Sequence, residues 1–261
     1  MSQRAACRIA RCARSVAQYR DRRIDDPQLL ERLRALAAER RRFGYRRPTL
    51  MLRREGFVLN HNRIYRVEGL QLRARRKRGV RYVRGNVVPT VSRPNERWSL
   101  DFVHDALSNG RKFRSLTIVD DFTRESIGIE VDFSLTGDRV VRVLSRLAGT
   151  RGLPPTLKFD NGTEFTSNAM LGCAAQADVE LHFIEPGRPM QNGSVESFNG
   201  RFRDELLNEH SFPTIFHARS AIEAWRIDYN DNRPHTALDG LTPTEFIEHH
   251  RTSSNSRSAA A

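Results

Sequence analysis

The chain has 261 residues, enough for one well-packed domain and a smaller second one. Its 38% hydrophobic and 29% charged residues are typical of a globular protein, and no apolar run approaches the ~18–20 residues that a membrane-spanning helix needs. The three cysteines have neither regular spacing nor a nearby His pair, which argues against a disulfide framework and a zinc finger. The basic N-terminus lacks the apolar stretch of a secretory signal, so we expect a cytoplasmic, nucleoid-associated protein with no membrane contact.

The net charge of +13 is concentrated at the start of the chain. Residues 1–84 contain 25 Arg and Lys but only 7 Asp and Glu, whereas the rest of the chain is slightly acidic. Clustered cations release counterions from a phosphate backbone, so this distribution predicts DNA binding. A solvated charge run in an Arg-biased genome would explain the preference for Arg over Lys, but not the asymmetry between the two parts.

Short helices are predicted for the basic part. Leucines at helical spacing indicate a helix over residues 27–42 that ends before Gly44, and a second helix fits residues 48–55. Asn62 is a candidate N-cap for a third, and residues 1–20 form an earlier one. Closely spaced, Arg-rich helices predict a small all-α, helix-turn-helix-like DNA-binding domain over residues 1–70. The alternative is a helical bundle that contacts protein.

A dense basic stretch with two nearby prolines follows, and we interpret residues 71–92 as a linker that extends along DNA. The candidate DNA contacts of this part are one arginine in the expected third helix and four cations of the linker: Arg63, Arg75, Arg76, Lys77 and Arg78.

From residue 93 the pattern changes to that of an α/β domain, which we expect to extend to residue 250. The first three predicted strands form an antiparallel meander, and the order β-β-β-α-β-α-β-α-α predicts a mixed five-stranded sheet with flanking helices. The Ser- and Ala-rich tail, residues 251–261, is predicted to be disordered. The strands are expected over 98–104, 113–120, 126–133, 156–159 and 179–184, and the helices over 138–147, 166–177, 191–208 and 214–230.

Three acidic residues stand out by their positions. Asp101 lies mid-strand between apolar neighbours, where a charge is costly unless it is paired or bound to a cation. Asp160 follows the fourth strand, at the kind of sheet edge where ligand sites lie. Glu196 borders the apolar stripe of a helix and is therefore expected near the sheet. Carboxylates suit two Mg²⁺ or Mn²⁺ ions, which can clamp the attacking and leaving oxygens of a phosphoryl transfer.

Several segments carry a family resemblance. WSLDFVHD, FDNGTEF and PGRPMQNGSVESFNGRFRDEL, with thirty-five residues between Asp160 and Glu196, resemble the Asp-Asp-Glu core of retroviral-integrase-like transposases. With YNDNRPHTALDGLTPTEF near the C-terminus, the chain is similar to the second-reading-frame transposase of insertion sequences of the IS-three type. The likeness covers nearly the whole chain, to about residue 248.

This resemblance implies an RNase H-like fold in which Asp101, Asp160 and Glu196 are catalytic and bind the metal ions. It implies DNA strand cleavage at the ends of an insertion sequence, followed by strand transfer to target DNA. It also implies a homo-oligomer on DNA and a first-reading-frame protein as fusion or partner. Thr163 stands where such proteins commonly have Pro, and LGCAAQ lacks a frequent Trp.

Other polar residues have competing interpretations. Arg188, Gln191 and Asn192 precede the Glu196 helix and either contact DNA phosphates or, for Asn192, cap the helix. We expect Asp120 and Asp121 to pair with Arg124 in a hairpin. Glu164 is interpreted as a solvent-facing acid of a first helical turn, Arg233 and His235 as residues that fix the C-terminal segment or meet DNA.

Three other functions are compatible with parts of the sequence. An RNase H-like nuclease, such as a resolvase, would share the carboxylates but would not join strands. A DNA-binding protein without activity would keep the basic part, although the intact acidic triad argues against it. A glycosidase with two carboxylates is disfavoured by the basic N-terminal part.

Overall fold

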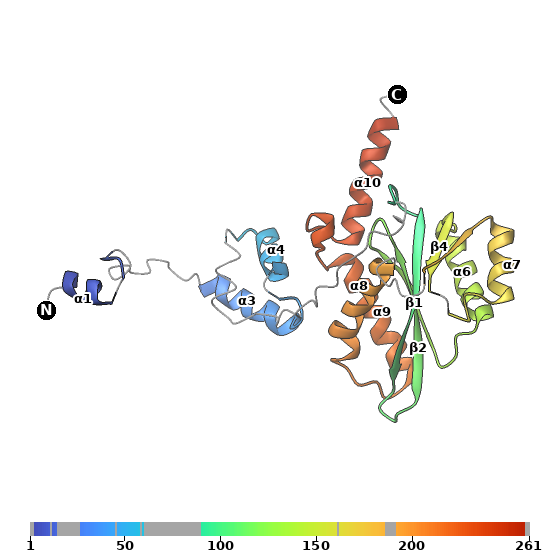
Figure 1. The fold of residues 1–261 in the computed structure, drawn as a ribbon, viewed down its shortest axis with the longest axis horizontal. Helices are drawn as coiled ribbons and strands as arrows, with labels where there is room; N and C mark the ends of the chain where they lie inside the picture. The colour runs from blue at the N-terminus through green and yellow to red at the C-terminus, as the bar shows by residue number, and fades with distance from the viewer. Residues whose placement is uncertain are drawn as a thin grey trace. The chain divides into compact units, whose positions relative to one another are not determined.

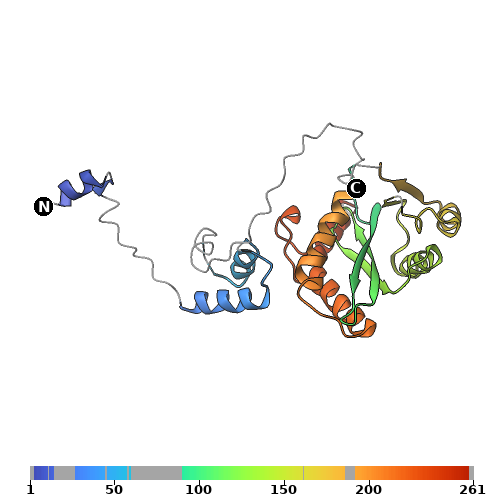
Figure 2. The same cartoon turned by 60° about the horizontal axis from the view of Figure 1, so that its bottom comes forward.

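A computed structural model describes residues 3–10, 12–14, 27–44, 46–57, 59, 90–160, 162–185 and 192–258, the last six without their side chains. The chain divides into two compact units, Met1–Gln71 and Leu72–Ala261. Figures 1 and 2 show the helices of the first unit and the sheet of the second. None of the helices in these ranges combines the length and apolarity that crossing a membrane requires.

The first unit contains helices α1 (Gln3–Ile9), α3 (Pro27–Glu39) and α4 (Arg46–Arg54). Leucines at helical spacing on α3 pack against α4, and the buried residues of this core are Leu29, Leu33, Leu36, Leu52 and Leu59. Helix α3 is three residues shorter than predicted because the chain turns over residues 40–44, where Gly44 has a left-handed backbone (φ +61°). The third predicted helix, which begins near Asn62 and includes Arg63, lies outside the described residues.

The second unit is a mixed five-stranded sheet with the order β3-β2-β1-β4-β5. Strands β1 (Arg97–Ala106), β2 (Lys112–Asp120) and β3 (Ser126–Asp132) form the expected antiparallel meander, and β4 (Thr156–Phe159) and β5 (Glu180–Phe183) continue it in parallel with β1. The predicted mixed sheet preceded by helices is thus confirmed.

Helices cover both faces of the sheet (Figures 1 and 2). One side carries α6 (Gly137–Arg151) and α7 (Asn168–Ala177). The other carries α8 (Gly193–Phe202), its π-helical continuation η2 (Arg203–Leu207) and α9 (Ile215–Asp231). Alternation along β1 supplies both cores: Trp98 and Leu100 pack in the α6 and α7 layer, whereas Val103 packs in the α8 and α9 layer. Asp101 alternates with Leu100 and therefore lies on the α8 side.

The end of the chain corrects the prediction of a disordered tail. After the short 3₁₀ turn η3 (Thr236–Leu238), helix α10 runs over Pro243–Ser258 and thus includes most of the segment from residue 251. Its start is a capping box, in which Thr242 N–H donates to Glu245 Oε2 (2.8 Å) and Glu245 N–H donates to Thr242 Oγ1 (3.2 Å). A well-capped start allows the helix to continue into a segment whose composition alone suggested disorder.

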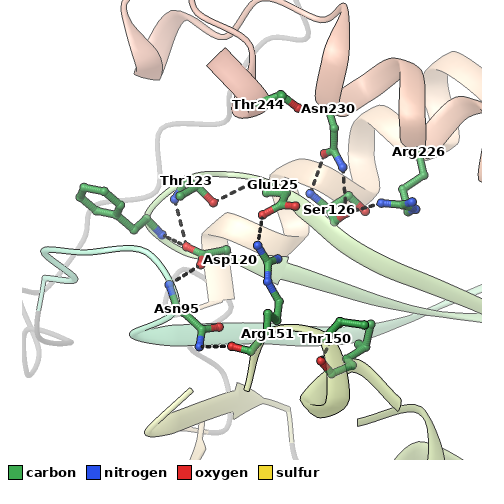
Figure 3. Close-up of polar contacts among 12 residues, drawn as sticks. Asn95, Asp120, Thr123, Glu125, Ser126, Thr150, Arg151, Arg226, Asn230 and Thr244 are labelled. Atoms are coloured by element: carbon green, nitrogen blue, oxygen red, sulfur yellow. Dashed lines mark hydrogen bonds and ion pairs between the residues drawn. The ribbon is translucent and has the colours of Figure 1, made fainter. Parts of the chain in front are cut away.

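The edge strand β3 is covered by polar side chains of α9. Asn230 is buried and makes two hydrogen bonds with Ser126, accepting from its N–H (2.9 Å) and donating to its carbonyl (3.0 Å), which Arg226 also reaches (2.9 Å) (Figure 3). Further along the strand, Arg219 Nε donates to the carbonyl of Val131 (2.8 Å). Side chains of α9 thereby satisfy backbone groups that an edge strand leaves without a neighbour.

Candidate active site

Asp101 lies in the middle of β1, half-buried on the face that α8 covers. Its Oδ1 accepts the N–H of Phe102 (2.7 Å), and its Oδ2 accepts the side-chain N–H of Asn199 (2.8 Å). The amide of Asn199 is itself held, because its Oδ1 accepts the hydroxyl of Thr117 (2.9 Å), the residue opposite Asp101 on β2. This chain of contacts fixes the orientation of the Asp101 carboxylate and ties it to α8.

The position of Asp160 follows from the parallel register of β1 and β4. Ser99 is level with Lys158, so two further residues along each strand bring Asp160 beside Asp101. The turn after Asp160 is tight: the N–H of Gly162 donates to Asp160 Oδ1 (3.1 Å), and a Cβ on Gly162 would lie only 3.1 Å from that same oxygen. A β-carbon at position 162 would therefore crowd the Asp160 carboxylate. Asn161 lies outside the described residues.

Glu196 lies in the first turn of α8, with its side chain exposed. Asn199, the partner of Asp101, follows three residues later on the same helix, so both project from the same side of α8. The helix packs across β1 and β2. Residues from a strand, a post-strand turn and a helix thus approach one another from distant parts of the sequence.

Electrostatic interactions connect the three carboxylates. Burial raises the pKa of Asp101, and the negative charge of Asp160 adds to this effect against the opposing hydrogen bonds. Partial desolvation of the otherwise exposed Glu196 carboxyl also raises its pKa, with a further contribution from the charge of Asp101. Asp101 therefore interacts with both other acids. No group of three or more His, Cys, Asp or Glu in the described part of the chain is close enough to hold a metal ion as it stands.

A buried charge cluster lies beneath the acids on the same face of the sheet. The carboxylate of Asp121 accepts from Arg97 Nε (2.7 Å), Lys158 Nζ (2.8 Å) and the hydroxyl of Ser99 (2.6 Å). Burial alone would raise the pKa of Asp121, but Lys158 and the hydrogen bonds outweigh it and the pKa is lowered. This arrangement corrects the expected pairing of Asp121 with Arg124, because two cations from neighbouring strands take that place.

The loop after Asp160 is attached to β2 by an ion pair. Glu164 contacts Arg114, whose guanidinium lies over the ring of Phe102 at 4.1 Å from its centroid. Phe102 also stacks on Phe165 from the same loop, with centroids 5.0 Å apart. Glu164 is therefore not the solvent-facing acid that the sequence suggested, since its partner comes from a strand fifty residues away.

Two further residues with a predicted role, Asn192 and Arg233, are buried in the structure. Asn192 is only 2% exposed and makes no side-chain capping hydrogen bond, so the predicted DNA contact would require its neighbours to move. Arg233 is buried and pairs with Glu205, which supports the structural interpretation of that residue. The other predicted DNA contacts lie outside the described residues: Arg63, Arg75, Arg76, Lys77, Arg78, Arg188 and Gln191.

Some residues of the site were not found from the sequence. Asn199 could have been, since a polar residue three positions after Glu196 shares its helix face. Arg203 could not, because its contact with the carbonyl of His104 (3.1 Å) depends on the π-helical turn after α8. The positive charge of Arg203 opposes the rise in the pKa of Asp101.

Comparisons with known proteins agree with this architecture. Residues 91–189 and 177–243 match models described as integrase core domains, and residues 23–78 match an HTH-like domain. The 31.7 kDa protein of insertion element IS407 from Burkholderia multivorans is 48% identical over 99% of this chain and 95% of its own length. The transposase for insertion sequence element IS904 from Lactococcus lactis is 26% identical over 84% of this chain and 92% of its own.

Among solved structures, the cryoEM structure of a simian T-cell lymphotropic virus intasome with a PP2A regulatory subunit is similar in fold, with a TM-score of 0.54 and 17% identity over 82% of this chain and 74% of that one. Sheet order, flanking helices and matched models define an integrase-core protein with an HTH-like domain before the core. Within that class, the chain belongs to the insertion-element transposases of the IS-three type.

Proposed function

We propose that this protein catalyses metal-dependent strand cleavage and strand transfer of an insertion sequence, with Asp101, Asp160 and Glu196 as its catalytic residues. The observation that carries the proposal is the convergence of the three acids: the strand register brings Asp160 beside Asp101, and Asn199, on the helix of Glu196, donates to Asp101 Oδ2. Burial, with a further contribution from the neighbouring negative charge, raises the pKa of Asp101 and of Glu196. Acids at protein sites that bind cations share this property when no cation compensates their charge.

The chemistry of the three side chains fits divalent cations. All three offer hard carboxylate oxygens, which Mg²⁺ and Mn²⁺ prefer. Asp101, Asp160 and Glu196 would hold two such ions. When bound there, they would supply positive charge to the attacking and leaving oxygens of the phosphodiester. Asn199 keeps the Asp101 carboxylate oriented, and Gly162 does the same for Asp160.

In the proposed reaction, water first cleaves the strand at the end of the element and frees a 3′-hydroxyl. The oxygen of that hydroxyl then forms a bond to a target phosphorus, while the bond from this phosphorus to the target's own 3′ oxygen breaks. The attacking hydroxyl loses its proton and the departing oxygen gains one, so the number of phosphodiester bonds is unchanged. The carboxylates serve as ligands, and no covalent protein–DNA intermediate forms.

The two units suggest a division of labour. We propose that residues 1–70 bind the element ends, that residues 71–92 link them to the core along the DNA, and that residues 93–250 carry the reaction. Family membership supports a homo-oligomer on DNA and a first-reading-frame protein as fusion or partner.

The test is strand transfer of an element-end DNA by the variants Asp101→Asn, Asp160→Asn and Glu196→Gln. We expect each to lose at least ~10³-fold of the wild-type rate, since a metal ligand contributes several kcal/mol to stabilising the transition state. Asp105→Asn, on the same strand as Asp101, is the matched control and should remain active. Unchanged cleavage in all three variants would overturn the site, and wild-type hydrolysis without joining would identify a nuclease instead.

A further inference from the structure

The hairpin between β2 and β3, residues 120–125, is fixed to several parts of the catalytic unit. The carboxylate of Asp120 accepts three backbone N–H groups, from Phe122 (2.8 Å), Thr123 (3.0 Å) and Asn95 (2.7 Å) (Figure 3). Glu125 pairs with Arg151 at the end of α6 (2.8 Å). A turn held at so many points is a rigid platform for any side chain that it presents.

Arg124 is the unusual residue of this hairpin. Its backbone is left-handed (φ +61°), a conformation that costs a non-glycine residue energy and that recurs in turns and at functional sites. Its N–H donates to the carbonyl of Asp120 (3.0 Å) and closes the turn. The fold therefore keeps an arginine where glycine or asparagine would be less strained.

The guanidinium of Arg124 reaches the helix that carries Glu196. Its Nη1 donates to the hydroxyl of Ser194, in the first turn of α8 and two residues before Glu196. This first turn has little support of its own, since the N-cap Asn192 makes no side-chain capping hydrogen bond. A cation near a helix N-terminus is also electrostatically unfavourable, so the contact does not stabilise the helix through its dipole.

We infer that Arg124 is a positioning residue, which fixes the first turn of α8 through Ser194 and thereby sets where Glu196 lies relative to Asp101. The effect on catalysis rests on the proposed function, whereas the positioning of α8 by Arg124 does not depend on it. The rigid hairpin supplies the fixed point, the left-handed backbone aims the side chain, and the hydroxyl of Ser194 receives it.

Arg124→Gly is the most informative variant. Glycine adopts a φ of +61° without strain, so this change removes the guanidinium while leaving the turn its conformation. Ser194→Ala removes the acceptor, and the double variant removes both. Asn95→Gly is the matched control, because Asn95 is also left-handed (φ +60°) and its side chain bonds to the carbonyl of Arg151 rather than to α8.

Hydrogen–deuterium exchange of the DNA-free, metal-free protein tests the positioning. We expect the amides of residues 196–199 to exchange roughly tenfold faster or more in Arg124→Gly and Ser194→Ala, since a hydrogen bond from a charged donor is lost. The double variant should be no faster than either single one, because both remove the same contact. The amides of α6 should exchange at the wild-type rate in these variants. In Asn95→Gly, the amides of α8 should do so as well.

The catalytic consequence has a separate readout. The Mg²⁺ concentration for half-maximal strand transfer should rise several-fold in Arg124→Gly and Ser194→Ala. Ser194→Thr, which keeps the hydroxyl, should have the wild-type value. Unchanged exchange at α8, additive effects in the double variant, or equal acceleration in α6 would overturn the inference. A wild-type protein that joined no DNA would overturn the proposed function instead, because the exchange experiment needs neither DNA nor metal.

Discussion

Asp101 is held in a place that disfavours its own charge. Burial and the charge of Asp160 raise its pKa, although Phe102 and Asn199 donate hydrogen bonds to the carboxylate. A carboxylate whose pKa is raised on folding contributes stability at low pH that is lost as the pH rises through the folded-state pKa. Without a bound cation, the ionised side chain therefore lowers the stability of the fold at neutral pH.

The variant Asp101→Asn should accordingly unfold at a higher urea concentration than the wild type at pH 7 in the presence of a chelator. The difference should shrink as the pH falls towards the ordinary carboxyl value of 3.8, where the wild-type side chain becomes neutral as well. Added Mg²⁺ should stabilise the wild type more than the variant. A variant that is less stable than the wild type at pH 7 would contradict this account.

At the scale of elements, α9 is the support of the hairpin strand β3. Both backbone groups of Ser126 are paired with the side chain of Asn230, and the site is buried (Figure 3). The segment YNDNRPHTALDGLTPTEF, which resembles the family pattern, thus has a structural role at Asn230. Arg233 of the same segment has a second one, since it pairs with Glu205 on η2, the continuation of the helix that carries Glu196.

Asn230→Ala should lower the free energy of unfolding by roughly 1–3 kcal/mol, because it leaves the amide and carbonyl of a buried strand end with fewer partners. Asn232→Ala is the control: that side chain, at the C-cap of α9, is exposed and donates to Asp228 in the last turn of the helix, so we expect a loss under about 0.5 kcal/mol. Urea unfolding curves measure both. Equal losses in the two variants would exclude the proposed support of β3.

Strands and helices could be predicted from the sequence where the pattern of neighbouring residues determines them. Aromatic and β-branched residues between turn signals located all five strands within a few residues. Asp101 was singled out because it lies between apolar residues of a strand, and Asp160 because it ends one. The contacts that complete the site could not be, since Asn199 and Asp101 lie 98 residues apart and Arg114 and Glu164 lie 50 apart. The capping box of α10 was a local signal that composition obscured.

At the scale of the whole molecule, charge separates the two parts of the chain. Residues 1–84 contain 25 cations against only 7 acids, whereas arginines of the five-stranded domain are paired with acids of the same domain, as Arg139 and Arg146 are with Glu130. Attraction to a phosphate backbone therefore belongs mainly to the first third of the chain.

Replacing Arg75, Arg76, Lys77 and Arg78 with alanine should reduce the salt dependence of DNA binding. Each lost phosphate contact removes about 0.9 from the slope of log affinity against log salt concentration, so the slope should fall by up to about 3–4. Arg142→Ala, an exposed cation on α6, should leave the slope unchanged. Fluorescence anisotropy with a labelled duplex at roughly 50 to 200 mM salt measures this slope. An unaltered slope would show that these four residues do not contact the DNA backbone.

The side chains that α9 lays along β3 also decide how copies of this protein can meet. Arg219, Arg226 and Asn230 already engage two carbonyls of this sheet edge, those of Val131 and Ser126, which makes it a poorer template for a foreign strand. The opposite margin, β5, is only four residues long. We therefore expect copies that gather on one DNA to contact each other through helices and loops rather than by pairing of strands.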